Sequence, residues 1–209
     1  LRAFNNRHVA DSLMKQNWGL RLPKERYTHS LPDSCKYEKC FKCEQNPVFP
    51  HIMDSLGGRS KYGAIKAMPA GNTLTFSMAR ACMEGENLGN GKATDFLCIS
   101  LSSTDYAGHQ FGPNSIEVED MYLRLDMEIA DFLKYLDAKV GRGNYLFFLT
   151  ADHGAAHNSQ YMIDEDVPAG FFQYNALLVE LNQYLKQEFK NDSLVIDYTN
   201  YQLFLNERL

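Results

Sequence analysis

One stretch decides the fold. Residues 94–154 read TDFLCISLSSTDYAGHQFGPNSIEVEDMYLRLDMEIADFLKYLDAKVGRGNYLFFLTADHG. Two near-continuous apolar runs lie within it, at residues 96–101 and 145–149, and neither alternates with polar residues. This pattern is typical of parallel strands that are covered on both faces. The stretch therefore predicts two strands of an α/β fold with a mostly parallel sheet flanked by helices.

A helix is predicted between the two strands. Asn114 or Ser115 can cap its start, and Glu117 stands where a capping box places its acidic residue. Gly141 and Gly143 supply the stop. The apolar residues of the segment recur at helical spacing on one stripe, which comprises Val118, Met121, Leu125, Ile129, Phe132, Leu136 and Val140. Residues 94–154 therefore form a predicted βαβ core.

An aspartate and a histidine follow each predicted strand. Asp105 and His109 are four residues apart, so one helical turn brings both side chains to the same side. Asp152 and His153 are adjacent, and Gly154 is free to turn the chain after them. Ligands of open α/β sheets bind beyond the carboxyl ends of the strands, and carboxylate with imidazole suits zinc. A single pair usually caps or makes a polar contact, whereas two pairs favour a two-metal or metal-plus-substrate site.

The two motifs and their surroundings resemble the alkaline phosphatase superfamily. The likeness is carried by TDFLCISLSSTDYAGHQFGPNSIEVEDMYLRLDMEI and FFLTADHGAAH, and it extends from LRAFN at residues 1–5 through GNTLT at 71–75 to YQLFLN at 201–206. The chain is most similar to the branch that joins type I phosphodiesterases and nucleotide pyrophosphatases to the monomeric, phosphate-irrepressible bacterial alkaline phosphatases. The resemblance implies that residues 1–209 are the central to C-proximal part of one such domain.

The resemblance also implies a site and a reaction. In the family two zinc ions lie close together, and by motif match Asp105 and His109 belong to the first ion while Asp152 and His153 belong to the second. The implied reaction is metal-dependent hydrolysis of phosphate monoesters through a Thr or Ser phosphoenzyme. The implied substrate is a small-molecule phosphate ester. The family is usually exported, so a periplasmic, secreted or cell-surface monomer is expected.

Three parts of the family pattern have no counterpart in the sequence. The nucleophilic Thr or Ser with its preceding aspartate, and the Lys/Arg pair that contacts phosphate, are expected upstream of the match. No histidine follows His157, so the last ligand of the first metal is missing. We therefore expect an internal piece of a longer chain, in which each zinc has two protein ligands, binds weakly and supports negligible hydrolysis.

Two other functions are open at this point. A nucleotide phosphodiesterase or pyrophosphatase of the same superfamily would use the aromatic-rich segment before Gly71 to stack a base. A non-catalytic binding module would keep the fold and bind a partner through residues 20–71. His157 is expected either to be exposed or to contact the metal-binding side chains without binding metal itself.

Composition sets the broad class. The chain has 209 residues, of which 44% are apolar and 22% charged, and this is typical of a globular domain with a real core. The net charge of -5 and the lack of a long basic patch argue against duplex nucleic acid as a partner. No apolar run approaches the length of a membrane span.

The rest of the chain contains further predicted elements. Residues 20–71 are rich in proline and glycine and form a long irregular excursion packed over the sheet. A loop is expected over residues 155–166. Regular elements are predicted as helices over residues 4–17, 72–84 and 176–189 and as a strand pair over residues 194–196 and 202–205.

Five cysteines are present. Cys35, Cys40 and Cys43 have C-x4-C-x2-C spacing, which is compatible with half of a zinc or iron–sulfur site. Without a fourth nearby cysteine, the pattern favours a surface loop with one disulfide and a spare thiol. Cys82 and Cys98 lie in apolar surroundings and are predicted to be buried.

Overall fold

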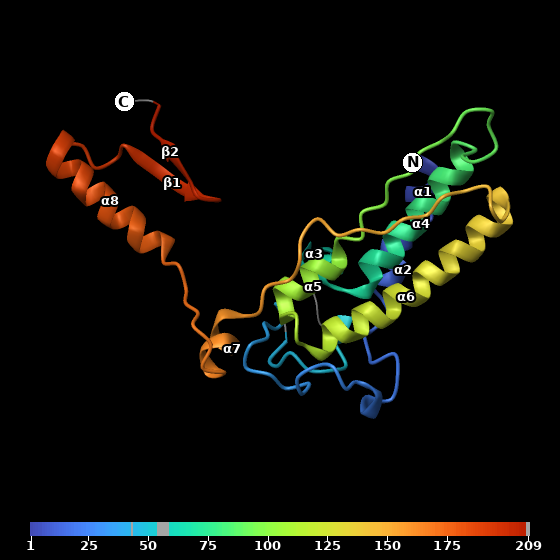
Figure 1. The fold of residues 1–209 in the computed structure, drawn as a ribbon, viewed down its shortest axis with the longest axis horizontal. Coiled ribbons are helices and arrows are strands. Elements are labelled where there is room, and N and C mark those ends of the chain that lie inside the picture. Colours follow the sequence, from blue (N-terminus) through green and yellow to red (C-terminus); the bar gives the residue numbers. More distant parts are fainter. Residues whose placement is uncertain (43, 54–58, 208–209) are drawn as a thin grey trace. The chain divides into compact units, whose positions relative to one another are not determined.

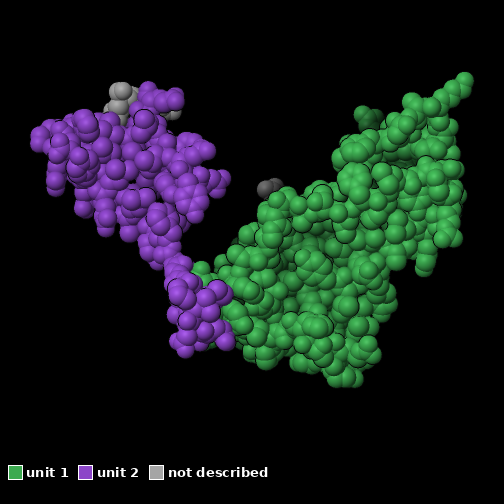
Figure 2. All heavy atoms as spheres, viewed as in Figure 1, with its two compact units in different colours: residues 1–161 green, residues 162–209 purple. Residues whose placement is uncertain are grey.

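The structure is a computed structural model that describes residues 1–42, 44–53 and 59–207. The chain divides into two compact units, residues 1–161 and 162–209 (Figure 2). Each unit is described by itself below. The expectation that all 209 residues belong to one domain stays a prediction.

Helices dominate the first unit (Figure 1). A 3-10 turn, Lys24–Arg26, lies between α2 and α3, another, Ile65–Ala67, follows α3, and a π-helical turn, Asp137–Gly141, follows α6. α7 crosses the boundary into the second unit. The α-helices are α1 Arg2–Asn5, α2 Val9–Leu13, α3 Arg59–Ala64, α4 Pro69–Gly85, α5 Ser103–Phe111, α6 Ile116–Leu136 and α7 Ser159–Asp164.

Two helix predictions need correction at their ends. The predicted helix over residues 4–17 is broken at His8, whose φ of 49° places it in the left-handed region between α1 and α2. The helix predicted from residue 72 begins earlier, at Pro69, because proline at the first helical position has its φ already set and needs no hydrogen-bonded N–H. Asn72 lies inside α4 and is buried.

α6 confirms the predicted long helix. Ser115 is its N-cap, and the Ser115 hydroxyl accepts a hydrogen bond from the amide of Val118 at 3.2 Å. Because Ser115 rather than Asn114 is the cap, Glu117 stands one position too early for a capping box, and that prediction is wrong. The predicted stripe is confirmed, with Val118, Met121, Phe132 and Leu136 buried and Leu125, Ile129 and Val140 packed beside them.

The two strands predicted around α6 are not formed. Residues 95–101 and 145–150 are extended, yet within the described residues neither segment pairs with a neighbour. The first segment packs on α4 and α6 through Leu97, Ile99 and Leu101, and the second does so through Tyr145. The other side of each segment is open, and Phe96 is 76% and Leu146 88% exposed. A strand requires ladder hydrogen bonds to another strand, so an apolar run alone does not make one.

Among its described residues, the excursion over residues 20–71 is irregular as predicted, except for the 3-10 turn Lys24–Arg26, the helical turns from Arg59 to Ala67 and the start of α4 at Pro69. It joins α5 and α6 in a core of Met14, Trp18, Phe41, Met53, Ala67, Met68, Ala107, Phe111, Val118 and Met121. Its main polar anchor is Asp120 of α6, which is fully buried. The Asp120 carboxylate accepts from the Trp18 indole at 2.7 Å, the Arg21 amide at 2.7 Å, the Tyr27 hydroxyl, and the Arg124 guanidinium at 2.6 Å.

The second unit confirms the predicted helix and strand pair. α8 is Tyr174–Phe189, and β1 Val195–Thr199 pairs antiparallel with β2 Gln202–Leu205, with a bulge between Val195 and Asp197. Asn182 of α8 ties the helix to β1, since its amide donates to the Val195 carbonyl at 3.1 Å. The predicted loop over residues 155–166 is partly wrong, because α7 forms within it.

The cysteines differ from the prediction. Cys35 and Cys40 are free thiols and so do not form the predicted disulfide with each other, while Cys43 lies outside the described residues. Cys98 is exposed because it lies on the open side of its extended segment, and Cys82 is half-buried.

None of the helices in the described part of the chain is both long and apolar enough to span a bilayer.

Candidate metal centre

Asp105 and His109 lie on α5, the helix that follows the first extended segment. The helix buries Ser103, Ala107 and Phe111 and leaves the opposite side to solvent. Asp105 and His109 occupy that open side, with side chains 47% and 74% exposed. The Asp105 Oδ2 and the His109 Nε2 are 3.5 Å apart. The expectation that a helical turn brings this pair together is confirmed, since four residues span one turn.

Two residues of α4 hold the start of α5 in place. Gly71 passes so close to Ser103 that a Cβ on Gly71 would lie 2.0 Å from the Ser103 hydroxyl oxygen and 2.5 Å from the Ile65 carbonyl. The buried Asn72 amide donates to the Thr104 hydroxyl at 3.1 Å. The sequence does not predict either role, because nothing in the local pattern of GNTLT at residues 71–75 indicates a contact with a helix about thirty residues away.

Asp152 and His153 lie at a bend in a loop, with no regular structure around them. Their side chains are 88% and 58% exposed, and the Asp152 Oδ2 and the His153 Nε2 are 3.6 Å apart. The His153 Nδ1 lies 3.0 Å from the Gly154 carbonyl, which can only accept. This contact places the imidazole proton on Nδ1 and leaves Nε2 with its lone pair for a metal. The same bond, together with the Asp152 and Asp105 carboxylates, raises the pKa of His153.

The two tips converge. The Asp105 Oδ1 lies 3.9 Å from the His153 Nε2, while the Asp105 Oδ2 faces His109. One carboxylate therefore stands between two imidazoles that come from segments more than forty residues apart in the sequence. His157, by contrast, is exposed, and its Nδ1 lies 3.1 Å from the Asn114 amide nitrogen at the turn before α6.

Within each Asp/His pair, the distance between the two donor atoms suits two ligands of one zinc ion. Two ligands of one tetrahedral zinc, each bound at 2.0–2.2 Å, are about 3.3–3.6 Å apart. The distances within the Asp105–His109 and Asp152–His153 pairs, 3.5 Å and 3.6 Å, match this separation, whereas the 3.9 Å between the tips exceeds it. In the part of the chain that the structure describes, no group of three His, Cys, Asp or Glu side chains is arranged to hold one metal ion. Each pair thus has the spacing of two ligands of one zinc ion.

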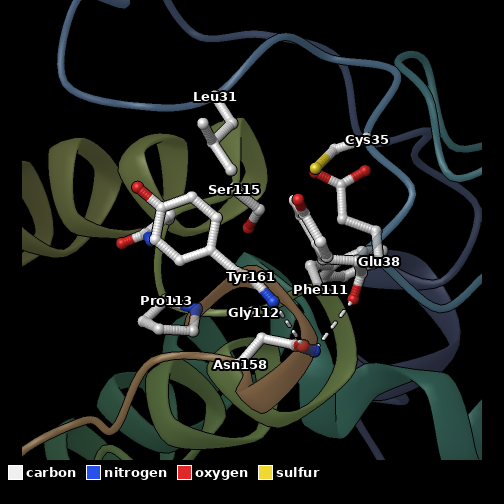
Figure 3. Close-up of a pocket in the computed structure, with 11 residues that line it drawn as sticks. Leu31, Cys35, Glu38, Phe111, Gly112, Pro113, Ser115, Asn158 and Tyr161 are labelled. Atoms are coloured by element: carbon white, nitrogen blue, oxygen red, sulfur yellow. Dashed lines mark hydrogen bonds between the residues drawn. The ribbon is translucent and has the colours of Figure 1, made fainter. Parts of the chain in front are cut away.

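A small cavity lies at the other end of α5. It measures about 10 Å³, which is room for one water molecule, and none of the four donor side chains lines it (Figure 3). Its wall is formed by Leu31, Cys35, Tyr37, Glu38, Phe111, Gly112, Pro113, Asn114, Ser115, Asn158 and Tyr161. The cavity is too small for a phosphate ester and belongs to the support of α5 rather than to a substrate site.

A family model described as type I phosphodiesterase / nucleotide pyrophosphatase matches residues 8–191. The chain belongs to this family. The stretch matched includes both Asp/His tips, α5 and α6, and the whole excursion over residues 20–71.

Two relatives are similar over nearly the whole chain. A protein named calcium-transporting ATPase from Myroides odoratus is 47% identical over 99% of this chain and 38% of its own length. Alkaline phosphatase PafA from Elizabethkingia meningoseptica is 45% identical, again over 99% of this chain and 38% of its own length. The chain therefore spans less than two fifths of these relatives.

A crystal structure of wild-type alkaline phosphatase PafA is similar in fold. It matches with a TM-score of 0.90 and 44% sequence identity over 99% of this chain and 39% of that chain. The match confirms the predicted class, an incomplete alkaline phosphatase-like α/β fold with an irregular excursion. It also agrees with the predicted membership of the superfamily branch that contains alkaline phosphatases.

Proposed function

We propose that the chain carries part of a two-zinc centre in an enzyme that hydrolyses phosphate monoesters. One observation carries the proposal: two Asp/His tips from separate segments meet at the Asp105 carboxylate, which lies 3.5 Å from the His109 Nε2 and 3.9 Å from the His153 Nε2. Structural polar contacts alone do not require such a meeting on the exposed side of a helix. Membership of the phosphodiesterase family supports the chemistry.

In this proposal Asp105 and His109 hold one zinc ion, and Asp152 and His153 hold the other. Zinc would supply a Lewis acid for the phosphoryl oxygens and lower the pKa of an attacking hydroxyl. The residues of this chain orient the donors. α5 fixes the angle between Asp105 and His109, and the Gly154 carbonyl holds the His153 ring with Nε2 outward. The nucleophilic Thr or Ser, a third ligand for each ion and the basic pair would come from elsewhere in a longer protein.

The monoesterase proposal is favoured over a nucleotide diesterase by the state of the excursion. Its aromatic rings are largely engaged within the protein: Tyr27 and Phe41 are buried, Phe49 packs on Trp18 at a centroid distance of 5.4 Å, and Tyr37 packs on Tyr161. These four rings are therefore not available to stack a nucleotide base, and Tyr62, which is 51% exposed, is the ring of the excursion that stays accessible. The names of the two relatives differ in activity at nearly equal identity, so the choice rests on residues rather than on names.

Substrate preference tests the proposed activity. A longer protein that contains residues 1–209 together with the remaining catalytic segments should hydrolyse nitrophenyl phosphate faster than bis-nitrophenyl phosphate. A preference for the diester would move the proposal to the phosphodiesterase alternative. We expect that protein to act as an exported monomer in the periplasm or at the cell surface, which fractionation and light scattering check.

The isolated chain should behave differently. With two protein ligands for each ion, zinc should bind weakly and hydrolysis should be negligible, because protein zinc sites use three or four ligands. Calorimetric titration of the 209-residue chain with zinc measures this. Tight binding of two ions would contradict the half-site interpretation. Partner binding without catalysis by the longer protein would instead favour the non-catalytic module.

A further inference from the structure

The two tips hold their relative position although no ladder connects the segments that carry them. Residues 95–101 and 145–150 lack strand pairing within the described chain, so sheet hydrogen bonds do not fix one tip against the other. Both tips are also exposed. The 3.9 Å approach of Asp105 to His153 therefore needs another support.

One side of that support is a clamp on the end of α5, directly after His109. The Gln110 side-chain amide donates to the Cys40 carbonyl at 2.8 Å and also to the Lys39 carbonyl. In return the Lys39 amide donates to the Gln110 carbonyl at 3.0 Å. Three hydrogen bonds thus join the helix end to a loop about seventy residues earlier in the sequence.

The same loop reaches the chain behind His153. The ring of Tyr37 packs edge-on against Tyr161 at a centroid distance of 5.5 Å. The Tyr37 carbonyl accepts from the Asn158 amide at 3.5 Å (Figure 3). Asn158 is itself held, because its Oδ1 accepts from the amides of Gln160 and Tyr161 in the first turn of α7.

A third group of contacts closes the arrangement at the turn between α5 and α6. The Leu31 amide donates to the Asn114 carbonyl at 2.8 Å, and the Asn114 side-chain amide lies 3.1 Å from the His157 Nδ1. Residues 31–40 therefore contact the chain on the C-terminal side of both Asp/His pairs. Phe111, at the end of α5, is buried, and its ring packs on that of Phe41 at a centroid distance of 5.2 Å. This contact holds α5 against the core.

We propose that residues 31–40 form a brace that sets the separation of the two Asp/His tips, with Gln110 and Tyr161 as positioning residues. The brace contacts neither a metal nor a substrate and acts only through the two segments that it joins. Its purpose, holding two half-sets of ligands in register for a pair of ions, rests on the proposed metal centre. The mechanical coupling of the tips does not rest on it.

Pulsed EPR measures the coupling without metal. Nitroxides at Asp126→Cys on the outer side of α6 and Ala155→Cys behind His153 report the position of the extended tip, in a protein whose native cysteines are serine. Gln110→Glu keeps the side-chain length but turns an oxygen toward the Lys39 and Cys40 carbonyls, and Tyr161→Ala removes the ring. Each should widen the distance distribution about twofold, because the contacts that it breaks hold the segment locally rather than globally.

Two control variants separate positioning from general damage. Tyr161→Phe keeps the ring and should restore the narrow distribution, and Gln183→Ala, on the exposed side of α8, should leave it unchanged. A distribution that is already broad in the reference protein would overturn the brace. The brace would also be overturned if the EPR distance distribution of Gln110→Glu were as narrow as that of the reference protein.

Cobalt binding then tests the purpose of the brace. Loss of a group that positions a ligand typically lowers metal affinity about 10–100-fold, so Gln110→Glu should lower cobalt affinity about tenfold and weaken the visible bands. If Gln110→Glu has the same cobalt affinity and the same visible bands as the reference protein, Gln110 does not position the metal ligands. If no cobalt binds to a longer protein that supplies the remaining ligands while the EPR coupling is found, the brace stands and the proposed metal centre fails.

Discussion

The two Asp/His tips are built in opposite ways. The first, Asp105 with His109, lies on a helix whose other side is buried in the core. The second, Asp152 with His153, lies at a bend in a loop in which every residue from 150 to 157 is exposed. Within the first tip the donors are positioned by helical geometry, whereas within the second they are positioned by one hydrogen bond to the Gly154 carbonyl.

The difference shows what a segment of an α/β protein can carry by itself. A helix satisfies its own backbone, so its side chains keep their spacing without neighbouring strands. A loop at the end of a strand depends on the sheet for its position, and here the strand has no ladder partner among the described residues. The predictions below test whether the helical tip is the sturdy half of the centre.

The largest effect is expected from Asp120, which ties the excursion to α6 beneath the helical tip. Asp120→Ala leaves the indole of Trp18 and the guanidinium of Arg124 without their buried acceptor. We expect the free energy of unfolding of the first unit to fall by about 3–5 kcal/mol. Urea unfolding followed by the fluorescence of Trp18, the chain's single tryptophan, measures this directly. Asp126→Ala, on the exposed side of the same helix, should change it by less than about 0.5 kcal/mol. Equal losses in the two variants would show that Asp120 is no anchor.

A pH dependence follows from the buried acids next to α5. Burial, helped by the Glu117 carboxylate, raises the pKa of Glu38 to about 8. Burial by itself would lower the pKa of His51, but hydrogen bonds to Glu117 and Glu44, with their charges, raise it to about 9. The Glu44 Oε1 is 2.9 Å and the Glu117 Oε1 3.4 Å from the His51 ring nitrogens, and burial raises the pKa of Glu117 as well.

Both raised pKa values act in the same direction. The folded protein holds these protons more tightly than the unfolded chain, so their stabilising contribution is present at low pH. It is lost as the pH rises, between 4.5 and about 8 for Glu38 and between 6.5 and about 9 for His51. We expect the free energy of unfolding to fall by about 2–4 kcal/mol from pH 6 to pH 9. Urea unfolding at several pH values tests the slope.

Glu38→Gln identifies the acid responsible. The amide mimics the protonated carboxyl, so the variant should match the parent protein at or below pH 4.5, where Glu38 is protonated in both states, and exceed it by at least about 2 kcal/mol at pH 9. Glu86→Gln, an exposed residue after α4, serves as the matched control and should follow the parent at both values. If the free energy of unfolding falls with pH equally steeply in Glu38→Gln and in the parent protein, a group other than Glu38 is responsible.

What the sequence predicts well in this chain is local. The apolar stripe of α6, the Ser115 cap and the four donor residues all depend on spacings within one turn or one loop. The strands over residues 96–101 and 145–149 failed because an apolar run does not reveal whether a partner strand lies beside it. The excursion was predicted only as irregular, since no short-range pattern indicates its long-range contacts.

Contacts between distant segments could not be predicted for the same physical reason. Gln110 binds two backbone carbonyls about seventy residues away, and backbone acceptors leave no trace in residue identity. The requirement for glycine at position 71 arises from Ser103 on another helix. The sequence predicts a capping-box role for Glu117, whereas the structure pairs Glu117 with the buried His51. Because His51 lies 66 residues earlier in the sequence, no local pattern indicates this contact.

Zinc affinity compares the two tips directly. Asp105 faces both His109 and His153, whereas Asp152 faces His153 alone. Loss of a group that only supports a ligand lowers metal affinity about 10–100-fold, and loss of a ligand itself should cost at least as much. We therefore expect about a 100-fold loss of zinc affinity for Asp105→Ala, which faces both imidazoles, and about a tenfold loss for Asp152→Ala, which faces one. Calorimetric or competition titrations of the 209-residue chain give both values, with Asp126→Ala as a charge-matched control. A larger loss from Asp152→Ala would reverse the ranking of the tips.

The smallest effect is expected at the cap of α6, which adjoins the helical tip. Ser115→Ala removes the acceptor of the Val118 amide, and because Ser115 is 3% exposed, water does not readily replace the hydroxyl. The free energy of unfolding should fall by about 1 kcal/mol, and Ser115→Asn, which retains a capping oxygen, should recover most of it. Zinc affinity should stay within about twofold of the parent, since the cap acts on the helix start and not on the donors. If Ser115→Ala instead weakened zinc binding as strongly as Asp152→Ala does, the helical tip would owe its geometry to α6 rather than to its own turn, and the contrast between a self-supporting tip and a dependent one would be lost.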